Sequence, residues 1–172
     1  MNLPARKPPP RDGSGGVALD ALRRIVRAIR VSSHAAEQAH GITGAQLFVL
    51  QQLRGGPVAS LRDLAVKTLT DESSVSVVVS RLVRKKLVVR RKSAADARRV
   101  ELSLSAAGAA LLRKAPEPAQ SRLVDALERV DARELAIVAR VLDGLAEEMG
   151  AATEPPRRFF EREPAKRKRS AS

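Results

Sequence analysis

The sequence predicts a mainly α-helical fold with a single two-stranded β-hairpin, built as one domain with a tail at each end. Apolar residues make up 44% of the 172 residues, whereas aromatic residues make up only 2%, so the core must be aliphatic. Most of these apolar residues recur at three- and four-residue spacing, which is the period of an amphipathic helix. One stretch instead alternates, with Val100, Leu102 and Leu104 separated by polar residues, as in a half-buried strand.

The two ends of the chain differ from its body. Residues 1–16 contain four prolines followed by three glycines, which predicts a disordered arm that cannot hold a helix or strand. From residue 151 onward, prolines and a run of lysines and arginines predict a disordered basic tail over residues 151–172. The folded domain is therefore predicted over residues 17–150, a size that suits a single core.

The first two helices of this body have clear signals. The first carries an apolar face made of Leu22, Ile25, Val26 and Ile29, and it is predicted to end before Gly41. The second begins with a capping box, in which Thr43 is the N-cap and Gln46 follows three residues later. Ile42 and Leu47 flank this cap at the spacing of a hydrophobic staple.

A short helix, a turn and another helix follow. Residues 55–57, Gly-Gly-Pro, end the second helix, and Ser60 is placed to cap a short third helix whose inward residues are Leu61, Leu64 and Ala65. A turn around residues 70–71 leads into the fourth helix. Its inward face is predicted to consist of Val75, Val78, Val79 and Leu82, which follow the i, i+3, i+4, i+7 rule.

The opposite face of the fourth helix is polar. It consists of Ser73, Val77, Ser80 and Arg84, flanked by Ser76 and Arg81. Hydroxyls, one methyl-bearing side chain and arginines suit contact with DNA. After this helix, Arg90, Arg91 and Lys92 precede a small polar turn, and Arg98 and Arg99 lead into the alternating strand, which predicts a hairpin with a basic tip.

The remaining helices are predicted from their caps and breaks. Ser105 can cap a fifth helix, which Pro116 and Pro118 interrupt because proline inside a helix costs about 3 kcal/mol. A helix resumes near Ala119, and Asp131 with Glu134 marks the start of the last helix. The apolar stripe of that last helix is predicted to be Leu135, Val138, Leu142, Leu145 and Met149.

The charge of the chain points to a polyanionic partner. The formal net charge is +13 and the isoelectric point is about 11.3. Residues 60–105 hold eleven lysines and arginines against five acidic residues, so much of the excess lies in one stretch. A local excess of this kind favours nucleic acid over a membrane as the partner. No stretch approaches the roughly 18 apolar residues of a membrane span, so we expect a cytoplasmic protein.

Several classes of function lack the residues that they need. The sequence has no cysteine, which excludes disulfides, thiolate metal sites and oxidant sensing through a thiol. It contains no Gly-rich phosphate loop, nucleophile triad or paired carboxylates, so we expect neither an enzyme nor a cofactor. A metal site built from His34, His40 and Glu37 is a weak alternative.

The order of short helix, turn, helix and basic hairpin is that of a winged helix-turn-helix, whose second helix can enter the DNA major groove. Over residues 17–150 the chain resembles the MarR family of bacterial regulators. The motifs that carry the resemblance are Leu64-Ala65, Ser73-Ser74-Val75-Ser76, Arg81-Leu82, Leu87-Val88, Asp96-x-Arg98-Arg99 and Leu104-Ser105 with Gly108.

The resemblance implies a homodimer held by helices in residues 17–40 and 105–150, with a DNA-binding part in about residues 58–105. It implies that the major groove is read by Ser73, Ser74, Ser76, Val77 and Arg81, and that Arg98 enters the minor groove. Lys86, Arg91 and Arg99 complete the predicted DNA-binding set. Taken alone, Arg98 and Arg99 are also typical of a solvated turn, and Ser73 and Ser76 of helix capping.

The sequence departs from the family pattern at four places. Lys86 stands where the family usually has glycine, so it must accept a turn conformation. Ala97 replaces the second acid of the wing, and Val77 stands where many relatives carry a polar or basic residue. Pro116 and Pro118 interrupt what is normally a long helix, so we expect the dimer arms to bend there.

The function that these observations predict is a ligand-responsive repressor that binds an inverted-repeat DNA operator as a homodimer. The resemblance implies a small aromatic acid as the effector. Its predicted site has Arg54 and His34 as carboxylate partners and Ile29, Leu50 and Leu53 as an apolar wall; ordinary surface charge and core packing are the alternative for these five residues. Two rival functions stay open, a nonspecific architectural DNA-binding protein and a protein-interaction adaptor that does not bind DNA.

Overall fold

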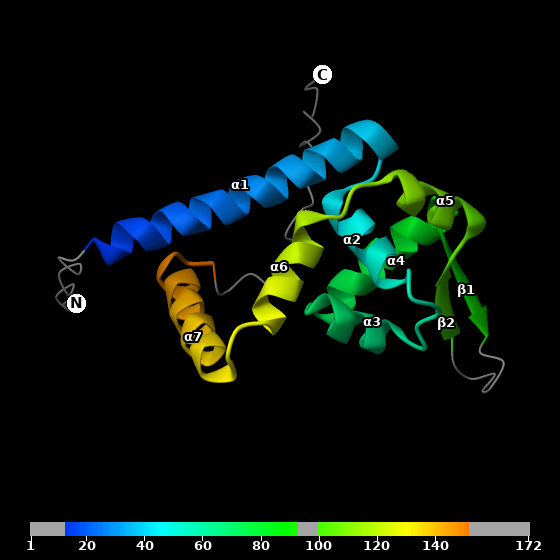
Figure 1. Ribbon diagram of the computed structural model, residues 1–172. Helices are drawn as coiled ribbons and strands as arrows, with labels where there is room; N and C mark the ends of the chain where they lie inside the picture. Colours follow the sequence, from blue (N-terminus) through cyan, green and yellow to red (C-terminus); the bar gives the residue numbers. More distant parts are fainter. Residues whose placement is uncertain (1–12, 93–99, 152–172) are drawn as a thin grey trace, which may run out of the picture.

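A long first helix leads into a small helical head that carries one β-hairpin (Figure 1). The computed structural model describes residues 13–92 and 100–151. The elements in chain order are α1 Ser14–His40, α2 Gly44–Gln52, α3 Leu61–Thr68, α4 Glu72–Arg84, β1 Val88–Lys92, β2 Val100–Leu104, α5 Ala106–Lys114, α6 Ala119–Glu128 and α7 Ala132–Glu148. The predicted fold class, mainly α with a two-stranded wing, is confirmed.

Helix α1 begins at Ser14, so the prediction that residues up to 16 cannot hold a helix is wrong for residues 14–16. Gly15 and Gly16 each cost about 1 kcal/mol of helix propensity relative to alanine. A helix that is already nucleated gains one hydrogen bond for each residue added, which allows a 27-residue helix to extend through them. The predicted end is confirmed, because Gly41 adopts a left-handed φ of 63° and its N–H bonds the carbonyl of Glu37. Residues 1–12 lie outside the described part.

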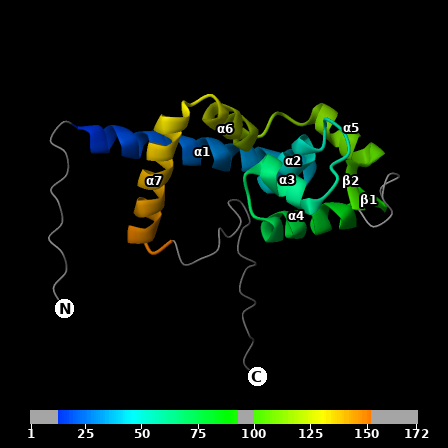
Figure 2. The ribbon, with the colours of Figure 1, turned by 90° about the horizontal axis from the view of Figure 1, so that it is seen from below.

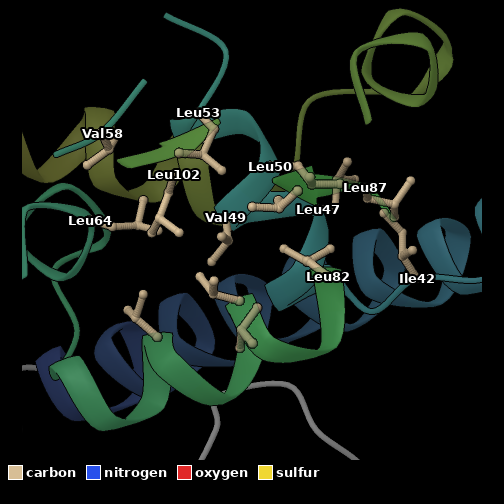
Figure 3. Close-up of a cluster of buried hydrophobic side chains, with 14 of the residues drawn as sticks. Ile42, Leu47, Val49, Leu50, Leu53, Val58, Leu64, Leu82, Leu87 and Leu102 are labelled. Carbon is tan, nitrogen blue, oxygen red and sulfur yellow. The ribbon is translucent and has the colours of Figure 1, made fainter. Parts of the chain in front are cut away.

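Helix α2 forms the centre of the head. The predicted capping box is present, with the Gln46 N–H donating to Thr43 Oγ1 at 3.2 Å and the Thr43 N–H donating to Gln46 Oε1 at 3.3 Å. Ile42 and Leu47 are both buried, as a staple requires. Because α1, α3, α4, α5 and α6 all contact α2, its apolar residues pack on several sides (Figure 3).

The hairpin is antiparallel, and it is attached to the head by a third segment. The register places Arg90 opposite Leu102 and Arg91 opposite Glu101. Val58, in the loop between α2 and α3, exchanges two backbone hydrogen bonds of 2.8 Å with Leu102. This bridge fixes the base of the wing to the core, in which Leu102 is buried. The wing tip, residues 93–99, lies outside the described residues.

The segment from α5 to α6 follows the predicted cap and breaks. The Gly108 N–H donates to Ser105 Oγ at 2.9 Å, which confirms Ser105 as the N-cap of α5. Pro116 lies in the irregular segment between α5 and α6, and Pro118 is the N-cap residue of α6. The Ala119 N–H then donates to Ser32 Oγ of α1 at 3.1 Å, so the start of α6 is held against the first helix.

The N-terminal half of α1 and the whole of α7 lie away from the head in both views (Figures 1 and 2). Asp131 caps α7 by accepting the Arg133 N–H at 2.8 Å. No residue of α7 is buried, and five large apolar side chains within the helix are at least 40% exposed: Ile137, Val138, Val141, Leu142 and Leu145. On α1, Val17, Leu19, Ile25, Val26 and Val31 are likewise exposed. The predicted stripe of α7 is therefore largely uncovered in a single chain, whereas in the predicted stripe of α1 Ile25 and Val26 are exposed, Leu22 is half-buried and Ile29 is buried.

Candidate DNA-binding surface

The recognition helix α4 begins at an acidic cap. The Ser74 N–H donates to Asp71 Oδ1 at 2.8 Å, and the Ser73 hydroxyl donates to the same oxygen at 2.5 Å. Hydrogen bonds from Ser73, and then from Ser74, hold the pKa of Asp71 well below its usual range. Asp71 is therefore charged at neutral pH, and a negative charge stabilises the N-terminus of a helix. Ser73 takes part in this cap, one of the two roles that its sequence position allowed.

The two faces of α4 are divided as predicted. The inward residues Val75, Val78, Val79 and Leu82 are all buried and belong to the core. On the other side, Ser73, Ser80 and Arg84 are exposed, whereas Ser74, Ser76, Val77 and Arg81 are half-buried. The structure thus gathers the predicted reading residues on and beside the solvent-facing side of one helix. Their contacts with DNA bases stay a prediction.

Lys86 connects α4 to the wing in a left-handed turn. Its φ is 58°, which confirms the prediction that a non-glycine residue must accept a turn conformation here. The carbonyl of Lys86 accepts a hydrogen bond from the Ser105 hydroxyl at 2.7 Å, so the turn is tied to the start of α5. The Lys86 side chain is exposed at the junction of the recognition helix and the hairpin.

The two arginines of β1 lie on opposite faces of the hairpin, because successive side chains of a strand alternate. Arg90 Nη2 lies 3.5 Å from Ser80 Oγ on α4. Arg91, the arginine of this strand in the predicted DNA-binding set, is opposite Glu101. The sequence reasoning did not select Arg90, although its spacing of two from the apolar Val88 could have placed it on the side of the core. Arg98 and Arg99 fall in the part of the wing that is not described.

The helix-turn-helix and its hairpin are similar to a known protein family. The model of the MarR family matches residues 40–99, which extend from the end of α1 to the wing. Over these residues the chain has the winged helix of the MarR family. A search of curated protein sequences found no match. The MarR family comprises DNA-binding transcriptional regulators rather than enzymes.

Three solved structures share this MarR fold. The transcriptional regulator BldR of Sulfolobus solfataricus is 19% identical, covers 83% of this chain and 99% of its own, and has a TM-score of 0.53. BpsR of Bordetella bronchiseptica, whose DNA binding is regulated by 6-hydroxynicotinic acid, is 24% identical, covers 81% and 99%, and has a TM-score of 0.52. A mutant of MarR from E. coli in complex with operator DNA is 22% identical, covers 79% and 99%, and also has a TM-score of 0.52. At these identities the likeness shows the fold alone.

The five residues predicted for an effector site differ in how deeply they are buried. Leu50 and Leu53 are 0% and 2% exposed and pack inside the core, which is the alternative that their sequence positions allowed. Ile29 is buried on α1, whereas His34 on α1 and Arg54 after α2 are exposed. Core packing accounts for the two leucines, and the role of all five residues in binding an effector stays a prediction.

In residues 13–92 and 100–151, which include His34, His40 and Glu37, no group of three or more His, Asp or Glu side chains is placed to hold a metal ion. None of the helices in those ranges combines the length and the apolar character needed to cross a membrane.

Proposed function

We propose that this protein is a homodimeric repressor of the MarR family that binds an inverted-repeat operator in the cytoplasm and releases it when a small aromatic acid binds. The observation that carries the proposal is the outward face of α4, where Ser73, Ser80 and Arg84 are exposed next to the basic strand β1. An α-helix fits the major groove, and hydroxyl and guanidinium groups can hydrogen-bond to base edges and phosphates.

The proposed partner in the dimer is a second copy of the chain. In a single chain α7 contributes no buried residue, and exposed apolar side chains cover it and the first half of α1. An apolar surface of this extent is unfavourable in water and is typical of a protein interface. Both helices lie on the same side of the head, so joining two copies through them leaves each recognition helix free (Figure 2). A twofold dimer of this kind suits an inverted repeat with half-sites about one helical turn, roughly 34–36 Å, apart.

The proposed effector acts by changing the spacing of the two recognition helices. A ligand shifts this spacing only if it binds the DNA-incompetent form more tightly, and a tenfold loss of DNA affinity needs about 1.4 kcal/mol of such preference. His34 and Arg54 are exposed and can contact a carboxylate. The regulation of BpsR by an aromatic acid supports this choice of ligand class. The absence of cysteine from the sequence leaves no thiol for an oxidant to act on.

Footprinting on the DNA upstream of the gene tests the proposal, combined with sedimentation of the free protein at micromolar concentration. We expect a dimer that protects an inverted repeat. Arg98→Ala should weaken operator binding by about 1–3 kcal/mol, whereas Arg167→Ala should reduce only the salt-dependent binding shared with random DNA. A monomer, or equal affinity for operator and random DNA, would contradict the proposal; the second result would favour an architectural protein.

The effector is tested by titrating a panel of aromatic acids against the operator complex, with peroxide as the control. We expect at least one acid to release the DNA and peroxide to have no effect. Release by peroxide alone would overturn this part of the proposal.

A further inference from the structure

The two neighbouring arginines of strand β1, Arg90 and Arg91, have different surroundings. Val88 is 3% exposed, and Arg90, two residues further on, lies on the same face of the hairpin. The register places Arg90 opposite Leu102, a core residue that is 1% exposed. Arg90 therefore starts on the core side of the wing and extends outward beyond its edge, where its Nη2 lies 3.5 Å from Ser80 Oγ on α4.

Arg91 has the opposite environment, although it is the next residue. It lies on the other face of the strand and pairs with Glu101 across the hairpin. Side chains directly opposite each other in an antiparallel pair are neighbours, so Arg91 has an acidic residue across the hairpin, whereas Arg90 has the apolar Leu102. The two neighbouring arginines thus differ in both direction and electrostatic surroundings.

Helix α4 adds a second guanidinium beside Arg90. Ser80 and Arg84 are four residues apart, so they are neighbours on one face of the helix, and both are exposed. The acidic residues Asp71 and Glu72 are at the other end of α4. Helix geometry therefore places Arg84 on the same face as Ser80, and Arg90 of the wing approaches the Ser80 hydroxyl. Guanidinium groups bind phosphate in a planar, two-pronged geometry, and hydroxyls also donate to phosphate oxygens.

We propose that Arg84, Ser80 and Arg90 form a phosphate cluster that holds the DNA backbone between the recognition helix and the wing, and that Arg91 is not part of it. The inference rests on the proposed binding of DNA by α4 and adds a contact that positions the protein. Because a phosphate contact carries no base information, the phosphate cluster contributes equally to operator and random DNA.

The test compares Arg90→Gln with Arg91→Gln in the full-length protein. The two substitutions remove the same charge from adjacent exposed residues of one strand, and glutamine keeps a polar side chain of similar reach. Affinity for a labelled operator duplex and for a scrambled duplex of equal length is measured over a series of salt concentrations. We expect Arg90→Gln to make the slope of log affinity against log salt shallower by about 1 on both duplexes, and Arg91→Gln to change the slope by clearly less.

A slope change of this size corresponds to about a 3.5-fold difference over a fourfold increase in salt. Arg84→Gln should reproduce the effect, and Arg90→Lys should restore the wild-type slope because it keeps the charge. An unchanged slope in Arg90→Gln, or an equal change in Arg91→Gln, would overturn the phosphate cluster while leaving DNA binding intact. Wild-type protein that binds neither duplex would overturn the proposed function as well, so the two failures are distinguishable.

Discussion

Gly108, in the first turn of α5, should not tolerate a single added methyl group. A Cβ at this position would lie 2.1 Å from the carbonyl oxygen of Leu87 and 3.1 Å from its carbonyl carbon. Leu87 cannot easily move away, because its carbonyl accepts the Ser105 N–H at 3.0 Å and the neighbouring carbonyl of Lys86 accepts the Ser105 hydroxyl at 2.7 Å. Gly108→Ala must therefore push α5 away from the start of the wing.

The magnitude follows from two opposing effects. Adding a methylene-sized group to a packed site costs about 1–3 kcal/mol, and the upper part of that range applies when the atoms that clash belong to the backbone. Alanine gains up to about 1 kcal/mol over glycine in helix propensity. We expect Gly108→Ala to lower the free energy of unfolding by about 1–2 kcal/mol. Ala107→Gly, at an exposed residue of the same turn, measures the propensity alone and should cost no more than about 1 kcal/mol.

Urea denaturation followed by circular dichroism measures both variants. All proteins are compared at one protomer concentration, because the stability of a dimer depends on it. The midpoint should fall for Gly108→Ala with an unchanged slope, since the amount of surface exposed on unfolding stays the same. If the Gly108→Ala protein were as stable as wild type, or more stable, the predicted clash would be refuted. That result would show that α5 can shift relative to the wing without a loss of stability.

Three further predictions concern a close approach at Gly44, the helix cap at Asp71 and the turn at Lys86. Gly44→Ala should destabilise the protein because the added Cβ would lie 2.0 Å from Ser33 Oγ. Ser33→Ala should partly restore the stability in a double-mutant cycle, whereas additive effects of the two substitutions would contradict the clash. The stability gap between wild type and Asp71→Ala should be wider at pH 7 than at pH 3 in urea melts. The lowered pKa of Asp71 makes the cap fully effective above its usual pKa of 3.8 and progressively lost as the pH falls through the lowered value, so an equal gap at both pH values would count against a charged cap. Lys86→Gly should leave the stability unchanged or raise it by up to about 1 kcal/mol in thermal melts, because it removes a left-handed non-glycine residue; a clear loss would mean that the lysine side chain stabilises the turn.

The sequence by itself determined the features that depend on residues a few positions apart. The capping box of Thr43 and Gln46 and the cap at Ser105 were predictable, because each is made by contacts within one turn of chain. The buried face of α4 was predictable for the same reason, since a helix places residues three and four apart on one side. The turn at Lys86 was predicted from the resemblance to the MarR family, which usually has glycine there. The start of α1 was misjudged, because local propensity was given more weight than the cooperativity of a long helix.

The tertiary structure decided the contacts between distant parts of the chain. Arg90 reaches Ser80 only because β2 fixes the register of β1 and the bridge to Val58 fixes the wing against the head. The alternation of a strand separates the faces of Arg90 and Arg91 in the sequence, but it does not show which residue of α4 the Arg90 side chain approaches. Likewise, the need for glycine at position 108 arises from the Leu87 carbonyl, 21 residues earlier in the sequence. Such contacts depend on how the elements pack, which residue spacing within one element does not encode.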